Sequence, residues 1–486
     1  MTMHRKIARR GRGFRPLPRL ALAAALLFPL AACDSVLDVS DPDVTRPESL
    51  LDPSNLPGLR ATVIGDFGVA FGGAGQTNGL VINSGLLGDE FYHSGTYGTN
   101  RAIDIRVVGD QNTDVATMMR NMYRARRSAT VGVASYAQNS PNTAGHAEMA
   151  SLEGYVYLFF AENFCGAVPF STGDNPDFEY GPPETKQQML DRAVASFDQA
   201  LTIAQAANSS AQLNLARVGK ARALLDLGRF AEAAAVARTV PDNFFYTIEY
   251  SENTTRQNNG IWGLNHNRRE IGLSSQEGGN GIAFRTGTAP AAFTVVYADP
   301  RLPWSFRNGS AAGSSIRHWF QNRYARQGAP LVLASGLEAR LIEAEAALNR
   351  GQSAAYLGPI NALRANAPTL LLGMGMEPPS RTETFQPMAA LADPGTPEAR
   401  VDQFFKERSY WLFGTAHRLG DMRRLVTQYG RPVNRVYPTG NYTRVYTSGT
   451  RIEGTYGDDV ALPVVFDEQN NPAFKEAVAQ CNTTQA

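Results

Sequence analysis

Apolar residues spaced three and four positions apart predict a mainly α-helical chain. The pattern is strongest from residue 146 to 240, where one helix face carries Leu190, Val194, Phe197, Leu201 and Ala204. The segment from Leu213 to Pro241 reads as two helices that meet at Gly228. The offsets of Leu224, Gly228, Phe230 and Ala233 are typical of a tetratricopeptide hairpin, in which an aromatic residue plugs the helix pair. An alanine-rich hairpin of no particular family is the other interpretation.

The same period returns in the C-terminal half. A stripe formed by Leu337, Leu341, Ala344 and Leu348 ends at Gly351, and a second helix is predicted from Ala354 to Ala367. Residues 368–400 read as a proline-rich loop. A last long helix is predicted from about Val401 to Tyr429, with an apolar stripe and a charged opposite face. The stripe is Phe405, Leu412, Leu419 and Val426, and the charged face is Lys406, Glu407, Arg408, Asp421, Arg423 and Arg424.

Two regions lack a clear period. Residues 59–130 mix glycine-rich loops with helical runs, and residues 242–330 are rich in Gly, Asn and aromatic residues. The tail after residue 429 reads as loops rich in Tyr, Gly and Thr. Long irregular segments in a folded chain often carry the function. The predicted fold is therefore an α-superhelical scaffold of tetratricopeptide-like hairpins with long irregular loops.

The N-terminus reads as a bacterial lipoprotein export signal. Residues 4–19 are basic and contain no acidic residue, and the apolar run from Leu20 to Ala32 is shorter than the roughly 20 residues of a permanent membrane span. Its exit, Leu30-Ala31-Ala32-Cys33, is similar to a lipobox, in which the cysteine takes a diacylglyceryl group and the chain is cut before it. We expect residues 1–32 to be removed, Cys33 to be lipidated, and residues 33–58 to form a tether.

Removal of the signal changes the charge and the cysteine count. The whole chain has 46 basic and 45 acidic residues, and residues 1–32 hold seven of the basic ones. The mature chain therefore has 39 basic and 45 acidic residues, which is a poor match for nucleic acid. Cys165 and Cys481 are the two cysteines left after lipidation. In an exported chain they can form one disulfide or remain separate small buried residues, and the sequence leaves both alternatives open.

The chain carries no recognisable enzyme motif. It has no His-Glu-x-x-His zinc motif, no Gly-x-Ser-x-Gly elbow and no Walker phosphate loop. The six histidines are scattered, and Asp89 and Glu90 are sequence neighbours, which rarely face one cavity. We therefore predict a protein that is not an enzyme and that has no catalytic residue, metal site or cofactor.

Five segments with distinctive motifs follow one another along the chain. They are residues 162–170 (ENFCGAVPF), 297–302 (YADPRL), 337–366 with an Ala-Glu-Ala core and a later Asn-x-x-Arg, 405–424 (FKERSYWLFGTAHRLGDMRR), and 462–472 with Leu-Pro and Asn-Pro. Together with the lipobox, they resemble the SusD/RagB family of nutrient-uptake outer-membrane lipoproteins over nearly the whole mature chain. Cys165 and the Leu-Pro-Val-Val tail depart from the family pattern, which argues against close kinship with the starch-binding member.

The resemblance implies a SusD-like body over residues 59–486, with one half to about residue 250 and the other from about residue 251. It implies a lipid-anchored protein of the outer membrane, on the cell surface, that binds a glycan or another oligomeric nutrient. It further implies delivery of that nutrient to a SusC-like TonB-dependent outer-membrane barrel. The alternative is a tetratricopeptide-type lipoprotein scaffold for outer-membrane assembly, for which more uniform repeats and fewer loops would be expected.

We expect the ligand site in the loops and a structural role for the family signature in the last helix. The signature residues are Glu407, Arg408, His417, Arg418, Asp421 and Arg424, and of these Arg408, Arg418, Asp421 and Arg424 are expected to form an ion-pair network. Sugars stack on aromatic rings and bond to polar side chains. The candidates are therefore Phe91, Tyr92, His93, Tyr97, Asn100 and Arg101 on one loop, and Trp262, Trp304 and Trp319 in the irregular middle region. Any one of these aromatics alone is more often a core residue.

Replacement of Cys33 tests the anchor. We expect Cys33→Ala to release the protein from membranes, because a lipid chain gains about 0.8 kcal/mol for each buried methylene and the variant cannot carry one. The measurement is the distribution of protein between membrane and soluble fractions. A variant that stays with the membranes as the wild type does would show that the anchor assignment is wrong.

Overall fold

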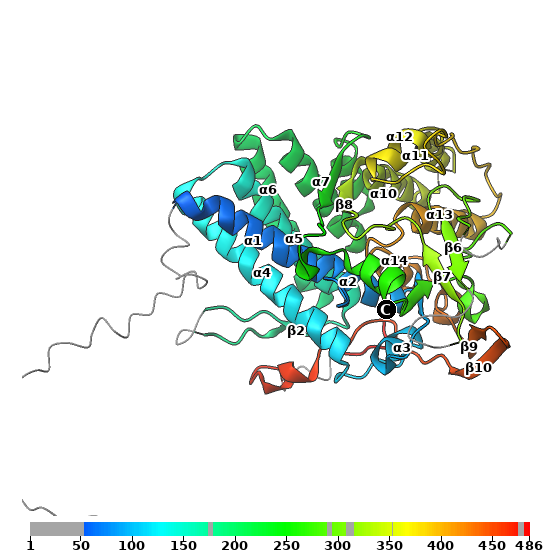
Figure 1. The fold of residues 1–486 in the computed structure, drawn as a ribbon. Helices are drawn as coiled ribbons and strands as arrows, with labels where there is room; N and C mark the ends of the chain where they lie inside the picture. The colour runs from blue at the N-terminus through cyan, green and yellow to red at the C-terminus, as the bar shows by residue number, and fades with distance from the viewer. Residues whose placement is uncertain (1–52, 174–177, 289–293, 308–314, 352, 475–480) are drawn as a thin grey trace, which may run out of the picture. The chain divides into compact units, whose positions relative to one another are not determined.

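The computed structural model describes residues 53–173, 178–288, 294–307, 315–351, 353–474 and 481–486 (Figure 1). The predicted signal and Cys33 lie outside the described residues. The described chain is mainly helical, as predicted, and residues 51–486 group into one compact unit. The main helices are α1 (Leu56–Gly72), α2 (Leu80–Leu87), α3 (Gly98–Asp104), α4 (Thr113–Asn139), α5 (Ala144–Asn163), α6 (Lys186–Ala206), α7 (Ser210–Asp226), α8 (Phe230–Ala237), α10 (Gly336–Asn349), α11 (Ser353–Ala365), α12 (Ala367–Gly373), α13 (Pro397–Trp411) and α14 (Arg418–Thr427).

Helix α5 is the centre of the helical layer. From His146 to Asn163 every residue except Glu153 is buried, which is the burial of a helix surrounded by other helices. It packs against α4, α6 and α7, and Figure 1 shows α1 running beside α4. A Cβ added at Gly154 or Gly219 would lie 2.9 or 2.3 Å from the ring of Phe197. The Phe197 ring is therefore wedged between α5 and α7, and only glycine gives it room.

The predicted helical stripe and hairpin are present. Leu190, Phe197 and Ala204 are buried on α6, which begins at a capping box made by Thr185 and Gln188. Gly228 turns the chain between α7 and α8 with a φ of +71°. Phe230 is only half-buried, and its ring lies 6.5 Å from that of Tyr429. That Phe230 plugs the α7–α8 pair, and with it the tetratricopeptide character of the hairpin, stays a prediction.

Three predicted boundaries in the C-terminal half are wrong. The loop expected from residue 368 begins only after α12, because Pro368 occupies the first turn of that helix, where proline is tolerated. The single helix expected from 401 to 429 is two helices, α13 and α14. The tail contains a hairpin of β9 (Asn441–Tyr446) and β10 (Gly449–Thr455), where only loops were expected.

The break between α13 and α14 comes from left-handed backbone at Gly414 and Ala416, which have φ angles of +65° and +58°. Residues 412–417 are buried although they are not helical. Their backbone groups find partners far away in the sequence: the Gly414 N–H donates to Glu90 at 3.1 Å, and the Phe413 carbonyl accepts from Tyr324 at 3.3 Å. The apolar stripe continues in phase across the break, so periodicity alone does not reveal it.

The charged residues of α13 and α14 are mostly buried rather than solvated. Arg408 lies 2.8 Å from Asp421, and Asp421 lies 2.6 Å from Arg424. Arg424 also pairs with Glu345 of α10 and lies 3.1 Å from Asp226 of α7. Despite burial, which by itself raises it, the pKa of Asp421 is about 2 because Arg408 and Arg424 favour its charged form.

Other charged residues of α13 and α14 make contacts with further motifs. Glu407 accepts from Arg301 at 2.7 Å and from Arg364 at 2.8 Å, so it connects the Asp-Pro-Arg turn with the Asn-x-x-Arg helix. Arg423 donates to three carbonyl oxygens, those of Ala161, Glu162 and Phe164. Arg418 differs from the expectation, since it donates to Ser409 and not to a carboxylate.

A disulfide joins Cys165 to Cys481, with their Cα atoms 4.9 Å apart. Of the two alternatives that the sequence leaves open, the structure therefore has the bridge. Beside it, the Cys165 N–H donates to the Leu462 carbonyl, and the Leu462 N–H donates to Asn163. The bridge and these two hydrogen bonds hold the C-terminal tail against the end of α5.

The described strands form five short antiparallel pairs. They are β1 (Phe91–His93) with β5 (Ile271–Leu273), β2 (Val168–Pro169) with β3 (Pro183–Glu184), β4 (Phe245–Ile248) with β8 (Leu331–Ser335), β6 (Trp304–Arg307) with β7 (His318–Gln321), and β9 with β10. The pairs β1–β5 and β4–β8 connect segments far apart in the chain. The irregular middle region is thus tied to both the N-terminal and the C-terminal helices.

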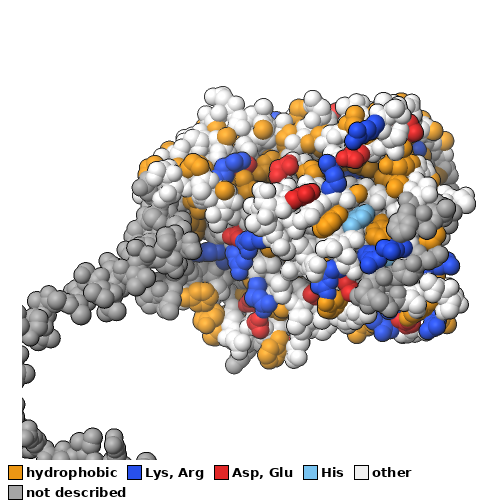
Figure 2. All heavy atoms as spheres, viewed as in Figure 1, with side chains coloured by type: hydrophobic (Ala, Val, Ile, Leu, Met, Phe, Trp, Pro, Cys, Tyr) orange, Lys and Arg blue, Asp and Glu red, His pale blue; other side chains and the backbone are white. Residues whose placement is uncertain are grey.

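Basic and acidic side chains are interspersed on the face seen in Figure 2. That face carries no large area of one charge sign. Among the residues that the structure describes, no helix combines the length and the apolar character needed to cross a membrane.

The Phe197 wedge can be tested with two glycine substitutions. We expect Gly219→Ala to destabilise the protein by about 1–3 kcal/mol, because the added methyl group collides with the ring. Gly65→Ala on α1 is the matched control, since nothing lies within 4 Å of its added Cβ and alanine favours a helix by about 1 kcal/mol. Urea unfolding measures both, and a stabilised Gly219→Ala would show that the wedge is not tight.

The structural role of His417 predicts a dependence of stability on pH. Burial lowers the pKa of His417 from 6.5 to about 4 although Glu338 lies 2.9 Å away. Between these values the unfolded chain binds a proton that the folded chain does not, so the free energy of unfolding falls as the pH falls. We expect His417→Gln to remove about 2 kcal/mol of that fall between about pH 7 and 4.5, measured by urea unfolding. Groups distant from position 417 cancel in this comparison. Glu338 does not, because despite burial, which by itself raises it, its pKa is lowered by His417, but it titrates mainly below about pH 4.5, so the comparison is made above that pH. Equal slopes there would contradict the structural role.

Candidate functional site

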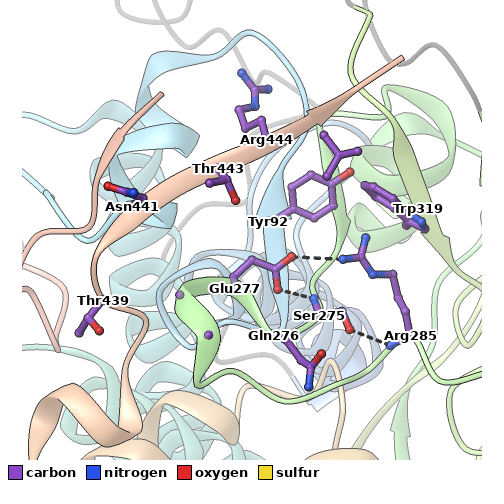
Figure 3. Close-up of a pocket in the computed structure, with 13 residues that line it drawn as sticks. Tyr92, Ser275, Gln276, Glu277, Arg285, Trp319, Thr439, Asn441, Thr443 and Arg444 are labelled. Carbon is purple, nitrogen blue, oxygen red and sulfur yellow. Dashed lines mark hydrogen bonds and ion pairs between the residues drawn. The ribbon is translucent and has the colours of Figure 1, made fainter. Parts of the chain in front are cut away.

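A pocket of about 310 Å³ lies where the middle region meets the C-terminal hairpin (Figure 3). Its walls come from β1, the segment of residues 275–285, β7 and β9. Most of its 13 lining residues have polar side chains, and Tyr92 and Trp319 are its aromatic members. These two are also the candidates from the sequence that the structure brings together here.

Strand pairing places Tyr92. In the β1–β5 ladder Tyr92 is opposite Gly272, and a Cβ at Gly272 would lie 2.2 Å from the tyrosine ring. Glycine at that position therefore lets the ring lie across the strand. The Tyr92 hydroxyl donates to the Arg317 carbonyl at 2.6 Å, and the ring meets Trp319 edge to face with centroids 5.8 Å apart.

Arg285 covers one part of the Trp319 ring. Its guanidinium carbon lies 3.9 Å from the ring centroid, and its Nη2 lies 3.4 Å from Glu277. Glu277 also accepts from the Ser274 hydroxyl and the Ser275 N–H, so the short turn at residues 277–279 is held in place. Figure 3 shows Glu277, Arg285 and Trp319 as one connected wall.

The opposite wall is the first strand of the C-terminal hairpin. Alternation along β9 leaves Asn441 and Thr443 exposed on one side and buries Tyr442 and Arg444 on the other. Tyr442 donates to Asp104 at 2.8 Å, and Arg444 donates to the Gly95 carbonyl at 2.7 Å. Two buried anchors thus fix a strand whose amide and hydroxyl groups face the pocket (Figure 3).

Buried carboxyl groups lie beneath this region. Burial raises the pKa of Asp104 to about 7 and that of Glu90 to about 8, and burial together with Glu277 raises the pKa of Asp89 well above its usual value. Asp89 accepts from Ser274 at 2.8 Å, whereas Glu90 accepts from Gly414. The neighbours Asp89 and Glu90 therefore face different partners.

The expectation that residues 89–101 form one loop is wrong, because they include β1 and the start of α3. Phe91 and His93 are buried in β1, and the Asn100 side chain accepts from Asn78 at 2.7 Å. Trp304 is also core, since it is 3% exposed and its indole donates to the Thr286 carbonyl. Ring faces buried in this way are not open to a ligand, because the strands that pair here enclose them.

Three other candidates keep some exposure but do not line the pocket. Tyr97 is 44% exposed, with the Arg268 guanidinium 4.3 Å from its ring. Arg101 donates to the Glu453 carbonyl, and Trp262 is half-buried on the short helix α9 (Gly260–Trp262). Ligand contact by these three stays a prediction.

Several pocket residues were not selected from the sequence. They come from two segments, 275–285 and 439–445. The alternating residues 441–446 carry a detectable strand signal. The turn at 277–279 has no comparable signal, since its glycines and polar residues fit any surface loop. In the described part of the chain, no group of three or more His, Cys, Asp or Glu side chains is arranged to hold a metal ion.

Comparison with solved structures finds SusD-like proteins. A SusD-like carbohydrate-binding protein from Bacteroides fragilis has a TM-score of 0.59 at 15% identity, covering 87% of this chain and 99% of that one. A SusD/RagB-family protein from Bacteroides thetaiotaomicron has 0.58 at 13%, covering 87% and 96%. A SusD-like carbohydrate-binding protein from Bacteroides vulgatus has 0.57 at 13%, covering 87% and 98%.

Sequence comparison alone does not identify the SusD-like proteins, since neither a protein-family model nor a curated protein matches the sequence. The similarity lies in three-dimensional structure and covers most of the chain. This chain is 12–16% identical to the first seven structures, and at that level the similarity is evidence for the fold. The resemblance indicated by the five motifs is thereby confirmed at that level: this chain has the SusD-like fold of the SusD/RagB proteins.

Proposed function

We propose that this protein captures an oligosaccharide in the pocket between Tyr92, Trp319 and β9. The observation that carries the proposal is the composition of the pocket. The half-buried Trp319, backed by Tyr92, which is only 5% exposed, stands on one side, and exposed hydroxyl and amide groups stand on the other. A sugar needs both kinds of surface, because its C–H face is apolar and its rim is made of hydroxyl groups.

The charged residues of the pocket favour a sugar that is bound through hydrogen bonds over one that is deeply buried. Beside the Trp319 ring, Arg285 offers hydrogen-bond donors and Glu277 offers an acceptor. The Arg285 guanidinium already covers part of one face of that ring. A sugar therefore stacks on the remaining aromatic surface or displaces the guanidinium. Stacking contributes on the order of 1–3 kcal/mol per ring for flat bases, and a sugar ring should not exceed this. The affinity for one sugar unit is accordingly modest.

Delivery to a transporter is the second part of the proposal. The lipobox at Cys33 predicts an anchor in the outer membrane, and the SusD-like fold is shared with proteins named for carbohydrate binding. A surface anchor and a modest-affinity site fit a protein that passes its cargo to a TonB-dependent barrel. A scaffold for outer-membrane assembly has no use for a pocket built from loops, so capture is favoured.

Trp319 is the residue to test. We expect Trp319→Ala to weaken glycan binding about tenfold or more while the melting temperature changes little, because the ring is half-buried at the pocket wall. Trp262→Ala is the matched control, since Trp262 is also half-buried and does not line the pocket. The measurement is calorimetry against a panel of soluble polysaccharides that includes starch, xylan, pectin and galactan.

Two outcomes would contradict the proposal. One is that no polysaccharide of the panel binds the wild type. The other is that Trp262→Ala loses binding while Trp319→Ala retains it. Thr443→Ala provides a second variant, because this exposed side chain on β9 can be shortened without disturbing the core.

A further inference from the structure

A second pocket, of about 730 Å³, adjoins the first one. Gly279 is part of the lining of both, so the turn of residues 277–279 separates them. The far side of the second pocket is formed by α13, α14 and the short helix α15 (Val433–Val436). This is the region of the last helices, where we expected no ligand from the sequence.

Arg418 lies in the wall of this second pocket and has no dedicated counter-ion. It is 5% exposed, its Nη1 donates to the Ser409 hydroxyl at 3.2 Å, and its Nε has no hydrogen-bond partner within the described chain. A guanidinium has five N–H donors, so most of its capacity is unused. The neighbouring Arg424 pairs with carboxylates, and Arg423 donates to three carbonyl oxygens.

None of the carboxyl groups around Arg418 forms a hydrogen bond or ion pair with it among the described residues, although Asp89, Asp421 and Glu90 attract its charge through space. Asp421 is shared by Arg408 and Arg424. Asp89 accepts from Ser274, and Glu90 accepts from Gly414. Burial raises the pKa of Asp89 well above its usual value and that of Glu90 to about 8, so these two groups compensate the guanidinium incompletely. A buried charge without an ion pair is costly, which makes an exogenous anion a favourable partner for this guanidinium.

Three further cations line the same pocket. They are Lys406 on α13, Arg431 and Arg435, while Asp402, which lies 2.9 Å from Arg431, is the one acidic lining residue. Lys406 and Arg435 are exposed, and neither has an ion pair among the described residues. The local charge is thus positive, although the mature chain has more acidic than basic residues.

We infer that the second pocket is an anion subsite, which binds the carboxylate or sulfate ester of an acidic oligosaccharide whose adjoining sugar occupies the first pocket. The inference rests on the proposed function and narrows it to acidic glycans. Arg418 supplies a planar donor set suited to the two oxygens of a carboxylate or sulfate, and Lys406 and Arg435 supply attraction at the entrance. The shared turn at Gly279 lets one chain of sugars reach both pockets.

The first test compares glycans that differ only in charge. Calorimetry is performed with oligogalacturonate and its methyl ester, and with a sulfated galactan oligosaccharide and its desulfated form. We expect wild type to bind one or both acidic forms at least tenfold more tightly, and the better acidic form distinguishes carboxylate from sulfate. Lys406→Ala/Arg435→Ala should lose this preference. Arg350→Ala/Arg381→Ala, which removes the same charge from exposed positions outside both pockets, should keep it.

The second test concerns Arg418. We expect Arg418→Met to abolish the preference for the acidic glycan while the melting temperature stays equal or rises, because the variant removes an unpaired buried charge. If Arg418 only supports the fold, the variant lowers the melting temperature and leaves the preference intact, which would overturn the inference.

The outcomes separate this inference from the proposed function. Equal binding of acidic and neutral glycans by wild type overturns the anion subsite and leaves glycan capture standing. If no glycan binds, the proposed function fails, and inorganic sulfate is then the probe. Stabilisation by sulfate that disappears in Lys406→Ala/Arg435→Ala would show an anion site for a ligand other than an oligosaccharide. Absence of that stabilisation overturns both ideas.

Discussion

The burial of charge along α13 and α14 is the constraint on which the rest of this structure depends. Arg408, Asp421 and Arg424 are almost inaccessible to water, and each would be strongly destabilising without partners. Their partners come from α7 and α10, and the neighbouring Glu407 is held by Arg301 and Arg364. The helices that carry these partners must therefore pack together, because the absence of any one of them would leave an uncompensated charge in the core. This explains why motifs scattered over the sequence meet in one place.

The same region positions the candidate site. The left-handed break at Gly414 presents an N–H to Glu90, which directly precedes β1. Strand β1 then carries Tyr92, and its pairing with β5 continues into the turn that holds Glu277. The site is thus built on backbone that buried polar contacts hold in place. Arg418 departs from this rule, because its charge is buried like the others but no carboxylate is assigned to it.

The candidate residues from the sequence divide by whether they reach the pocket and not by burial alone, since Tyr92 is only 5% exposed. Tyr92 and Trp319 line the pocket, whereas Phe91, His93, Asn100 and Trp304 lie in the interior. A three-residue strand such as β1 is too short for alternation to be read from its sequence, so Tyr92 could not be distinguished from its neighbours. Residues 277–279 and β9 reach the pocket through contacts with distant segments. Local patterns contain no information on such contacts.

By itself, the sequence determined the helical periods, the hairpin turn at Gly228, the motif resemblance to SusD-like proteins and a pair of cysteines able to form a bridge. These are local or compositional properties, and helices follow from spacing because one face must be buried. Only the tertiary structure decided that Cys165 meets Cys481, that the last helix breaks at Gly414, and which aromatics are open. It also decided which charges are paired, because a counter-ion is chosen by proximity in space and α14 finds its partners on helices roughly 80 to 200 positions earlier in the chain.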